Sequence, residues 1–88
     1  MRKAALVRFY FHQSTRDGMV EDPDGSDLPD LAAAVAEALI AARHLWAEAI
    51  LQERDRGGES FEITDEDGRL LISVPLRNAL PESLRHGA

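Results

Sequence analysis

The chain has 88 residues, which is enough for a single domain and too short for a second folded unit. It contains no cysteine, so disulfide bridges, zinc sites built on thiolates and cysteine nucleophiles are excluded. Ten basic residues stand against 16 acidic ones, and the net charge of −6 argues against a general binder of nucleic acid or of anionic membranes. Because a core this small is marginal, we expect a partner subunit to add stability.

The N-terminal residues do not predict a targeting or membrane segment. The apolar stretch at 4–7 is interrupted by Arg8, which leaves it too short for a secretory signal or a membrane span. We therefore expect a cytoplasmic protein without membrane contact. Residues 1–6 are interpreted as an N-terminal extension, residues 7–80 as one domain and residues 81–88 as a flexible tail.

The first predicted element is a strand over 7–12, where β-branched and aromatic residues follow one another. A turn cluster at 14–18 separates it from residues 19–22, which are expected to return as a second strand. Pro23 and Gly25 then end the hairpin, because proline lacks the N–H of a sheet ladder and glycine permits a tight turn. The first part of the chain is therefore a predicted β-hairpin.

Residues 30–54 predict a long helix, because they are rich in Ala, Leu, Ile and Glu and contain neither Gly nor Pro. Asp30 is its expected N-cap, and the glycines at 57 and 58 are expected to end it. The apolar face is far wider than a narrow stripe. The polar line that is left consists of Glu37, His44, Glu48 and Gln52. One sheet cannot cover so much apolar helix, and we expect a second copy of the chain to cover the rest.

A second hairpin is predicted after the helix. Residues 60–64 alternate, 65–68 form a turn, 69–74 return, and Pro75 closes the pair. The expected fold class is α+β, with two β-hairpins flanking one long α-helix (ββαββ) and the helix packed on a four-stranded, mainly antiparallel sheet. The strand order 2-1-3-4 is expected, because it makes neighbouring strands antiparallel.

Several short segments, in the same order and at similar spacing, resemble one family of proteins. They are RFYFH at 8–12, DG at 17–18 and 24–25, LPDL at 28–31, EA at 37–38, TDEDG at 64–68 and VPLRNA at 74–79. Over roughly residues 8–80 the chain thus resembles domain-of-unknown-function family 6894, whose members are short and mainly alphaproteobacterial. The resemblance implies a compact ββαββ domain and no established activity. A looser likeness, to the antitoxin halves of small toxin–antitoxin pairs, is an analogy of layout.

Alternation along the first strand separates two sets of side chains. Val7, Phe9 and Phe11 share one face, and the other carries Arg8, Tyr10 and His12. We expect the phenylalanines to pack under the helix and the second set to face solvent. The alternative is that the second set is a recognition surface for single-stranded nucleic acid, with Arg2, Lys3 and Arg16 as nearby cations. The net charge speaks against this alternative.

Two acidic stretches, at 17–30 and 65–67, are expected to meet at one end of the domain. They do not form a calcium-binding EF-hand loop, because Gly25 falls at position 4 instead of 6 when Asp22 is position 1. Solubility and compensation of the helix dipole account for most of these acids. Two alternatives stay open, namely docking of a basic partner and weak binding of a divalent cation by Asp22, Asp24, Asp65 and Asp67.

No enzyme and no cofactor are expected. His12, Ser14 and Asp17 lie on a strand and its turn and point in divergent directions, so they do not predict a nucleophilic triad. His44 has no second histidine three or four residues away, and no glycine-rich phosphate loop occurs.

The function expected from the sequence is a small non-enzymatic interaction or regulatory module that forms a homodimer and has an unidentified protein partner. Trp46 is interpreted as a core residue or, together with Ile40, Ile50 and Leu51, as part of the dimer interface. The alternative is an antitoxin-like or regulatory protein associated with nucleic acid. Binding to DNA or RNA that falls steeply with salt would separate the two.

Overall fold

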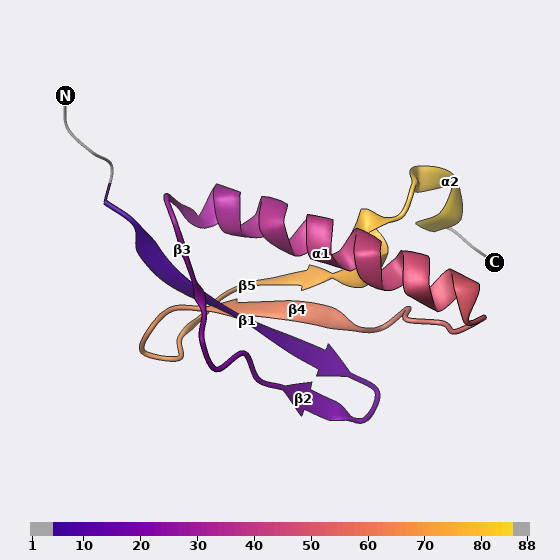
Figure 1. Cartoon of the computed structure of the whole chain (residues 1–88), viewed down its shortest axis with the longest axis horizontal. Coiled ribbons are helices and arrows are strands. Elements are labelled where there is room, and N and C mark those ends of the chain that lie inside the picture. Colours follow the sequence, from indigo (N-terminus) through magenta and orange to yellow (C-terminus); the bar gives the residue numbers. More distant parts are fainter. Residues whose placement is uncertain (1–4, 86–88) are drawn as a thin grey trace.

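The computed structural model describes residues 5–85, which form two layers with α1 lying on one face of an antiparallel sheet (Figure 1). The strands are β1 (Val7–Thr15), β2 (Gly18–Val20), β3 (Ser26–Leu28), β4 (Ser60–Thr64) and β5 (Leu70–Pro75). The helices are α1 (Leu31–Leu51), the 3-10 turn η1 (Leu76–Ala79) and α2 (Glu82–Arg85). The predicted α+β class is confirmed, and the order of the elements is broadly ββαββ.

The sheet has the order β2-β1-β4-β5, which confirms the predicted order of the two hairpins. The prediction of four strands was wrong, because β3 also pairs with β1. β1 is longer than expected, and β2 pairs with its residues 13–15 while β3 pairs with residues 7–9. A three-residue strand containing Asp27 is too short to show alternation in the sequence.

The chain between β2 and β3 is fastened beside β1 by one carboxylate and one glycine. Oδ1 of Asp22 accepts hydrogen bonds from the backbone N–H groups of Asp24 and Gly25, both at 3.2 Å. Its Oδ2 accepts from the N–H of Phe11 at 3.1 Å. Gly25 has φ +70°, and a Cβ there would lie 2.9 Å from the carbonyl oxygen of Phe9. Only glycine fits this position, because any side chain would collide with backbone.

The helix begins where the sequence predicted, since Oδ1 of Asp30 accepts from the N–H of Ala33 at 2.8 Å. The helix ends at Leu51, several residues before the expected glycines. Here Glu53 takes the left-handed conformation at φ 55°, and the N–H of Arg54 donates to the carbonyl of Ala49 at 2.7 Å. This is a Schellman motif with a glutamate at the position where glycine is usual. The prediction that the glycines at 57 and 58 end the helix was therefore wrong.

Small residues bring α1 close to the sheet. Of its buried residues, all except Trp46 are alanines, and their small side chains let the helix backbone approach the strands. The core consists of Phe9, Ala34, Ala38, Ala42, Trp46, Ala49, Phe61, Ile63, Val74 and Leu76. Nε1 of Trp46 donates to the carbonyl of Leu76 at 2.7 Å, which ties the helix to η1. Trp46 is therefore a core residue, which is the first of the two interpretations given from the sequence.

Residues 81–85, which the sequence analysis assigned to a flexible tail, contain α2. Arg85 holds this segment in place, because its Nε donates to the carbonyl of Leu80 at 2.9 Å and its Nη2 to that of Asn78 at 3.0 Å. The predicted extension at 1–6 and the cations Arg2 and Lys3 lie largely or wholly outside the described residues. Within residues 5–85, no helix has both the length and the hydropathy needed to cross a membrane.

Candidate functional site

One face of the sheet is covered by α1, and the opposite face, here called the open face, is not covered by a helix of the described chain (Figure 1). Cross-strand register places Tyr10 opposite Thr64, His12 opposite Glu62, and Glu62 opposite Ser73, so these side chains share the open face. Phe9, on the other face, is buried. Phe9 and Phe11 belong to or pack against the core as expected, whereas Val7, predicted on the same face, is 44% exposed.

His12 is held by hydrogen bonds at both ring nitrogens. Its Nδ1 accepts from the backbone N–H of Asp22 at 3.1 Å, and its Nε2 lies 3.2 Å from Oγ1 of Thr64. Since Nδ1 is an acceptor, the ring proton belongs on Nε2, which donates to the threonine. The ring of Tyr10 stacks on that of His12, with centroids 6.2 Å apart and planes inclined by 8°. The two rings form a fixed platform, and both nitrogens of His12 are engaged by groups of the fold.

Glu62 carries an uncompensated negative charge on the open face. Its carboxylate accepts hydrogen bonds from the hydroxyls of Ser60, at 2.8 Å, and of Ser73. The ion pairs of the described chain are Arg8 with Asp27 and Arg56 with Glu59, each at 2.8 Å. Neither involves Glu62, whose carboxylate is therefore oriented by neutral hydroxyls alone.

Two adjoining hollows lie over the open face. The larger, of about 540 Å³, is lined in part by Met19, Glu21 and Leu70, together with Glu62. The smaller, of about 200 Å³, shares lining residues with it and adds Tyr10, Asp22, Asp65 and Glu66. Neither hollow is lined by a lysine or an arginine, and the acidic side chains that line them are Glu21, Asp22, Glu62, Asp65 and Glu66.

Arg8, the predicted cation of this strand face, is paired. Its Nε and Nη2 donate to the two carboxylate oxygens of Asp27 at 2.8 and 3.0 Å. This hydrogen-bonded pair raises the pKa of Arg8 and lowers the pKa of Asp27. Arg8 therefore does not combine with Tyr10 and His12 into an unpaired cationic surface for an anionic ligand.

The four candidate metal ligands do not form a cluster. Asp22 and Asp65 both line the smaller hollow, whereas Asp24 and Asp67 do not. Asp65 closes its own turn, because its Oδ1 accepts from the N–H groups of Asp67 and Arg69, both at 2.9 Å. Within residues 5–85, no group of three or more His, Asp or Glu side chains is placed to hold a metal ion. The predicted convergence of acids is thus only partial.

The carboxylate of Asp22 is stabilised in its ionised form. Partial burial opposes its ionisation, but the hydrogen bonds from the N–H groups of Phe11, Gly25 and Asp24 outweigh that effect and hold its pKa below the usual value. The ionised carboxylate is therefore a structural part of the loop beside the open face.

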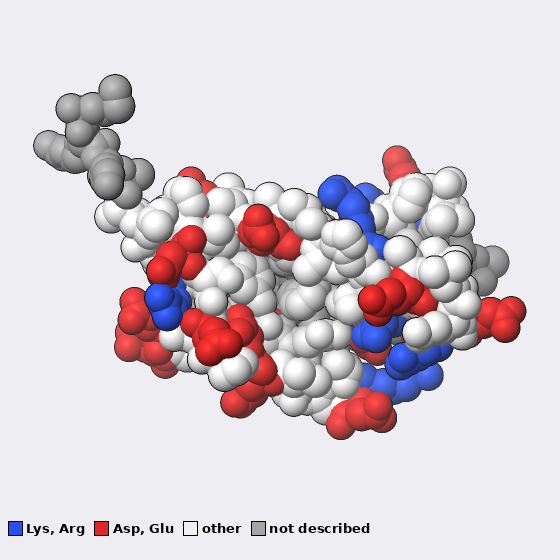
Figure 2. All heavy atoms as spheres, viewed as in Figure 1, with Lys and Arg blue, Asp and Glu red and all other residues white. Residues whose placement is uncertain are grey.

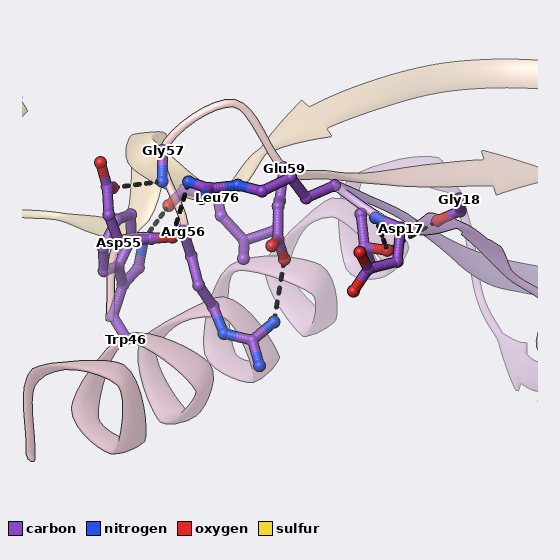
Figure 3. Close-up of polar contacts among 10 residues, drawn as sticks. Asp17, Gly18, Trp46, Asp55, Arg56, Gly57, Glu59 and Leu76 are labelled. Carbon is purple, nitrogen blue, oxygen red and sulfur yellow. Dashed lines mark hydrogen bonds and ion pairs between the residues drawn. The ribbon is translucent and has the colours of Figure 1, made fainter. Parts of the chain in front are cut away.

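Acidic side chains gather at the end of the molecule near β3, whereas most of the visible basic side chains lie at the other end, here called the arginine end, where acidic side chains are mixed with them (Figure 2). At the arginine end, Arg56 donates to Glu59 in an ion pair whose side chains are only 16% and 9% exposed (Figure 3). A groove of about 550 Å³ beside this pair also holds Arg16, Arg54 and Asp17. The sequence analysis missed this groove, because its residues come from the β1–β2 turn and from the segment after α1.

The outward side of α1 exposes apolar residues. Ile40, Ile50 and Leu51 are 44%, 61% and 85% exposed, whereas Trp46 is 9% exposed. The predicted interface set is thus split between a core residue and three residues on the surface. A groove of about 580 Å³ lies between the C-terminal half of α1 and α2, lined in part by Ile50 and Leu84.

Comparisons with curated proteins and with solved structures found no match. A family model described as "Domain of unknown function (DUF6894)" matches residues 8–77, which is most of the chain. The match covers β1, α1 and both strands of the second hairpin and runs into η1. It thus includes the segments on which the sequence resemblance was based, except for the last two residues of the segment at 74–79. This chain belongs to the DUF6894 family, whose function is unknown.

Proposed function

We propose that this protein is a small, non-enzymatic interaction module of the cytoplasm that acts as a homodimer through the outward side of α1. The observation that carries the proposal is a stripe of exposed residues spaced alternately by four and three, on the side of the helix away from the sheet. This α1 stripe consists of Ala36, Ile40, Arg43, Ala47 and Ile50. The same spacing lets two helices pack against each other along their length.

The α1 stripe is self-complementary when two copies of the helix lie antiparallel. A pair centred near residue 45 sets Ile40 opposite Ile50 of the second copy, and Arg43 opposite its Ala47. The small alanine leaves room for the aliphatic stem of the arginine. Residues that meet in this reciprocal way are what the two-fold symmetry of most homodimers requires.

The groove between α1 and α2 supports a second copy as the occupant. Ile50 and Leu84 give the groove an apolar lining, and Arg85 lies at its rim. Glu37 and Ile40 are neighbouring exposed positions of α1. When Ile40 of one copy enters the groove of the other, Glu37 brings a carboxylate towards the basic rim. Apolar contact and charge complementarity therefore favour the same arrangement.

Catalysis is left out of the proposal because three titratable side chains at the centre of the open face already have structural partners. His12 uses both ring nitrogens, Asp22 accepts three backbone N–H groups, and Glu62 accepts two hydroxyls. A cytoplasmic setting fits a chain that has no cysteine to pair in an oxidising compartment. The nucleic-acid alternative lacks a comparable supporting observation in residues 5–85, where Arg8 is engaged by Asp27.

The test is the mass of the protein in solution, measured by light scattering after size exclusion at about the tens-of-micromolar concentrations where moderate dimers form. We expect a dimer for the wild type and a folded monomer for Ile40→Glu, with folding checked by circular dichroism. Met19→Glu is the matched control, because Met19 is similarly exposed but lies on β2 and not on α1. A wild-type monomer, or a dimer lost equally in both variants, would overturn the proposal.

A further inference from the structure

The larger hollow of the open face has the composition of a site for a cation on an apolar stem. Glu21 and Glu62 line it, and Met19 and Leu70 contribute side chains that are 54% and 56% exposed. Arginine and lysine side chains combine a charged head with an aliphatic stem, so they suit a surface where apolar groups stand between carboxylates. We propose that the open face binds a basic peptide segment of another protein, with one arginine or lysine side chain seated in this hollow.

Glu62 is oriented for such a ligand before the ligand arrives. The hydroxyls of Ser60 and Ser73 hold its carboxylate, and neither hydroxyl neutralises its charge. Because the ion pairs of the described chain lie elsewhere, an incoming guanidinium or ammonium group would not have to displace a resident cation. A pre-oriented charge reduces the ordering cost of binding.

The stacked rings of Tyr10 and His12 add a second contact surface next to Glu62. Hydrogen bonds to Asp22 and Thr64 fix the imidazole, and the tyrosine ring lies parallel to it. Guanidinium groups stack on aromatic rings, and the smaller hollow beside the rings is lined by further carboxylates. The open face therefore fits a segment with two basic residues better than a single cation.

Other ligand chemistries fit this face less well. A nucleic acid or another polyanion would meet carboxylates in both hollows. A divalent cation would need three or more clustered ligands, which residues 5–85 do not provide. The negative charge of the carboxylates and the exposed apolar side chains of Met19 and Leu70 together favour a basic peptide.

This binding site is separate from the proposed homodimer interface, because the α1 stripe belongs to the helix and the open face is the face of the sheet that this helix does not cover (Figure 1). A dimer formed through α1 would display one open face on each of its outer sides. The variant Ile40→Glu, expected to be monomeric, should therefore bind a basic peptide as tightly at each site as the wild type does. Failure of the dimer and failure of the peptide site can thus be told apart.

The probe is a blocked peptide, acetyl-Gly-Arg-Gly-Arg-Gly-amide. Its affinity for the protein is measured by titration calorimetry at low ionic strength. Its counterpart contains citrulline in place of arginine and keeps the shape without the charge. Three variants of the full chain each remove one negative charge: Glu62→Gln and Glu21→Gln in the hollow, and Glu37→Gln on the far side of α1. We expect the arginine peptide to bind about fivefold more weakly to the two hollow variants and equally well to Glu37→Gln.

The matched variants separate a local site from general attraction to an acidic protein. Equal weakening in all three variants, or an absence of binding to the wild type, would overturn the proposal. So would equal binding of the citrulline peptide, because the contact would then be apolar and not cationic. Self-association of the wild type that disappears in Glu62→Gln would also overturn it, since the occupant would then be the arginine end of a second copy.

Discussion

The covered and open faces of the sheet are built from the same strands but are held in place by different interactions. Below α1, Phe61 and Ile63 alternate with Glu62 and Thr64, so that β4 sends apolar groups to the helix and polar groups outward. The covered face is sealed by apolar contact. The open face is ordered by hydrogen bonds that involve loops and neighbouring strands. Exposure alone therefore does not describe the open face, because several of its polar side chains are held by hydrogen bonds and not merely solvated.

The largest expected effect comes from the covered face. Ile63 is fully buried, and Ile63→Ala should lower the free energy of unfolding by about 3 kcal/mol, because it leaves a cavity under α1. Leu70→Ala on the open face is the control and should cost less than about 1 kcal/mol. Urea unfolding followed by circular dichroism measures both. Equal losses would show that the two faces contribute to stability in the same way.

The second largest loss of stability is expected from the hydrogen bond that joins Trp46 of α1 to Leu76 of η1. Trp46→Phe removes the donor to the carbonyl of Leu76 and leaves that buried oxygen without its partner. We expect a loss of about 2 kcal/mol in the free energy of unfolding, from the hydrogen bond and the lost ring volume together. Peptide binding to the open face should not change. An unfolding curve identical to that of the wild type would contradict the role given to this bond.

The loop beside the open face offers a test by pH. The pKa of Asp22 is lowered in the folded state, so its contribution to stability is present above the unfolded value of about 4 and is lost as the pH falls through the folded value. Asp22→Ala should cost about 1 to 2 kcal/mol at neutral pH. The difference between the variant and the wild type should then shrink below about pH 4. A difference that stays constant down to about pH 2 would exclude this linkage.

The smallest expected effect is a stabilisation at a position that belongs to neither face. Glu53→Gly should raise the free energy of unfolding by about 0.5 to 1 kcal/mol, because glycine adopts the left-handed conformation of this position without strain. Neither dimerisation nor peptide binding should change. A destabilised variant would show that the Glu53 side chain makes a contribution larger than its backbone strain.

The candidate site was predicted in part. The sequence identified Tyr10 and His12 as partners on one strand face, because alternation is a local property. It did not identify Glu62 as their neighbour, since 50 residues separate Glu62 from His12 and only the pairing of β1 with β4 brings them together. Met19, Glu21 and Leu70 were missed for the same reason. Asp22 was noticed as a possible metal ligand, but its role in binding backbone N–H groups depends on the loop geometry.

Local patterns in the sequence were enough to predict the two hairpins, the long helix and its N-cap at Asp30, because side-chain periodicity and capping act over a few residues. Other features appear only in the folded chain: β3 joins the edge of β1, the helix stops with Glu53 in a left-handed conformation, and Trp46 donates a hydrogen bond to Leu76. The strand edge that β3 covers and the carbonyl that Trp46 binds belong to distant parts of the chain. Such partners exist for a residue only once the layers have packed, so no local pattern can contain them.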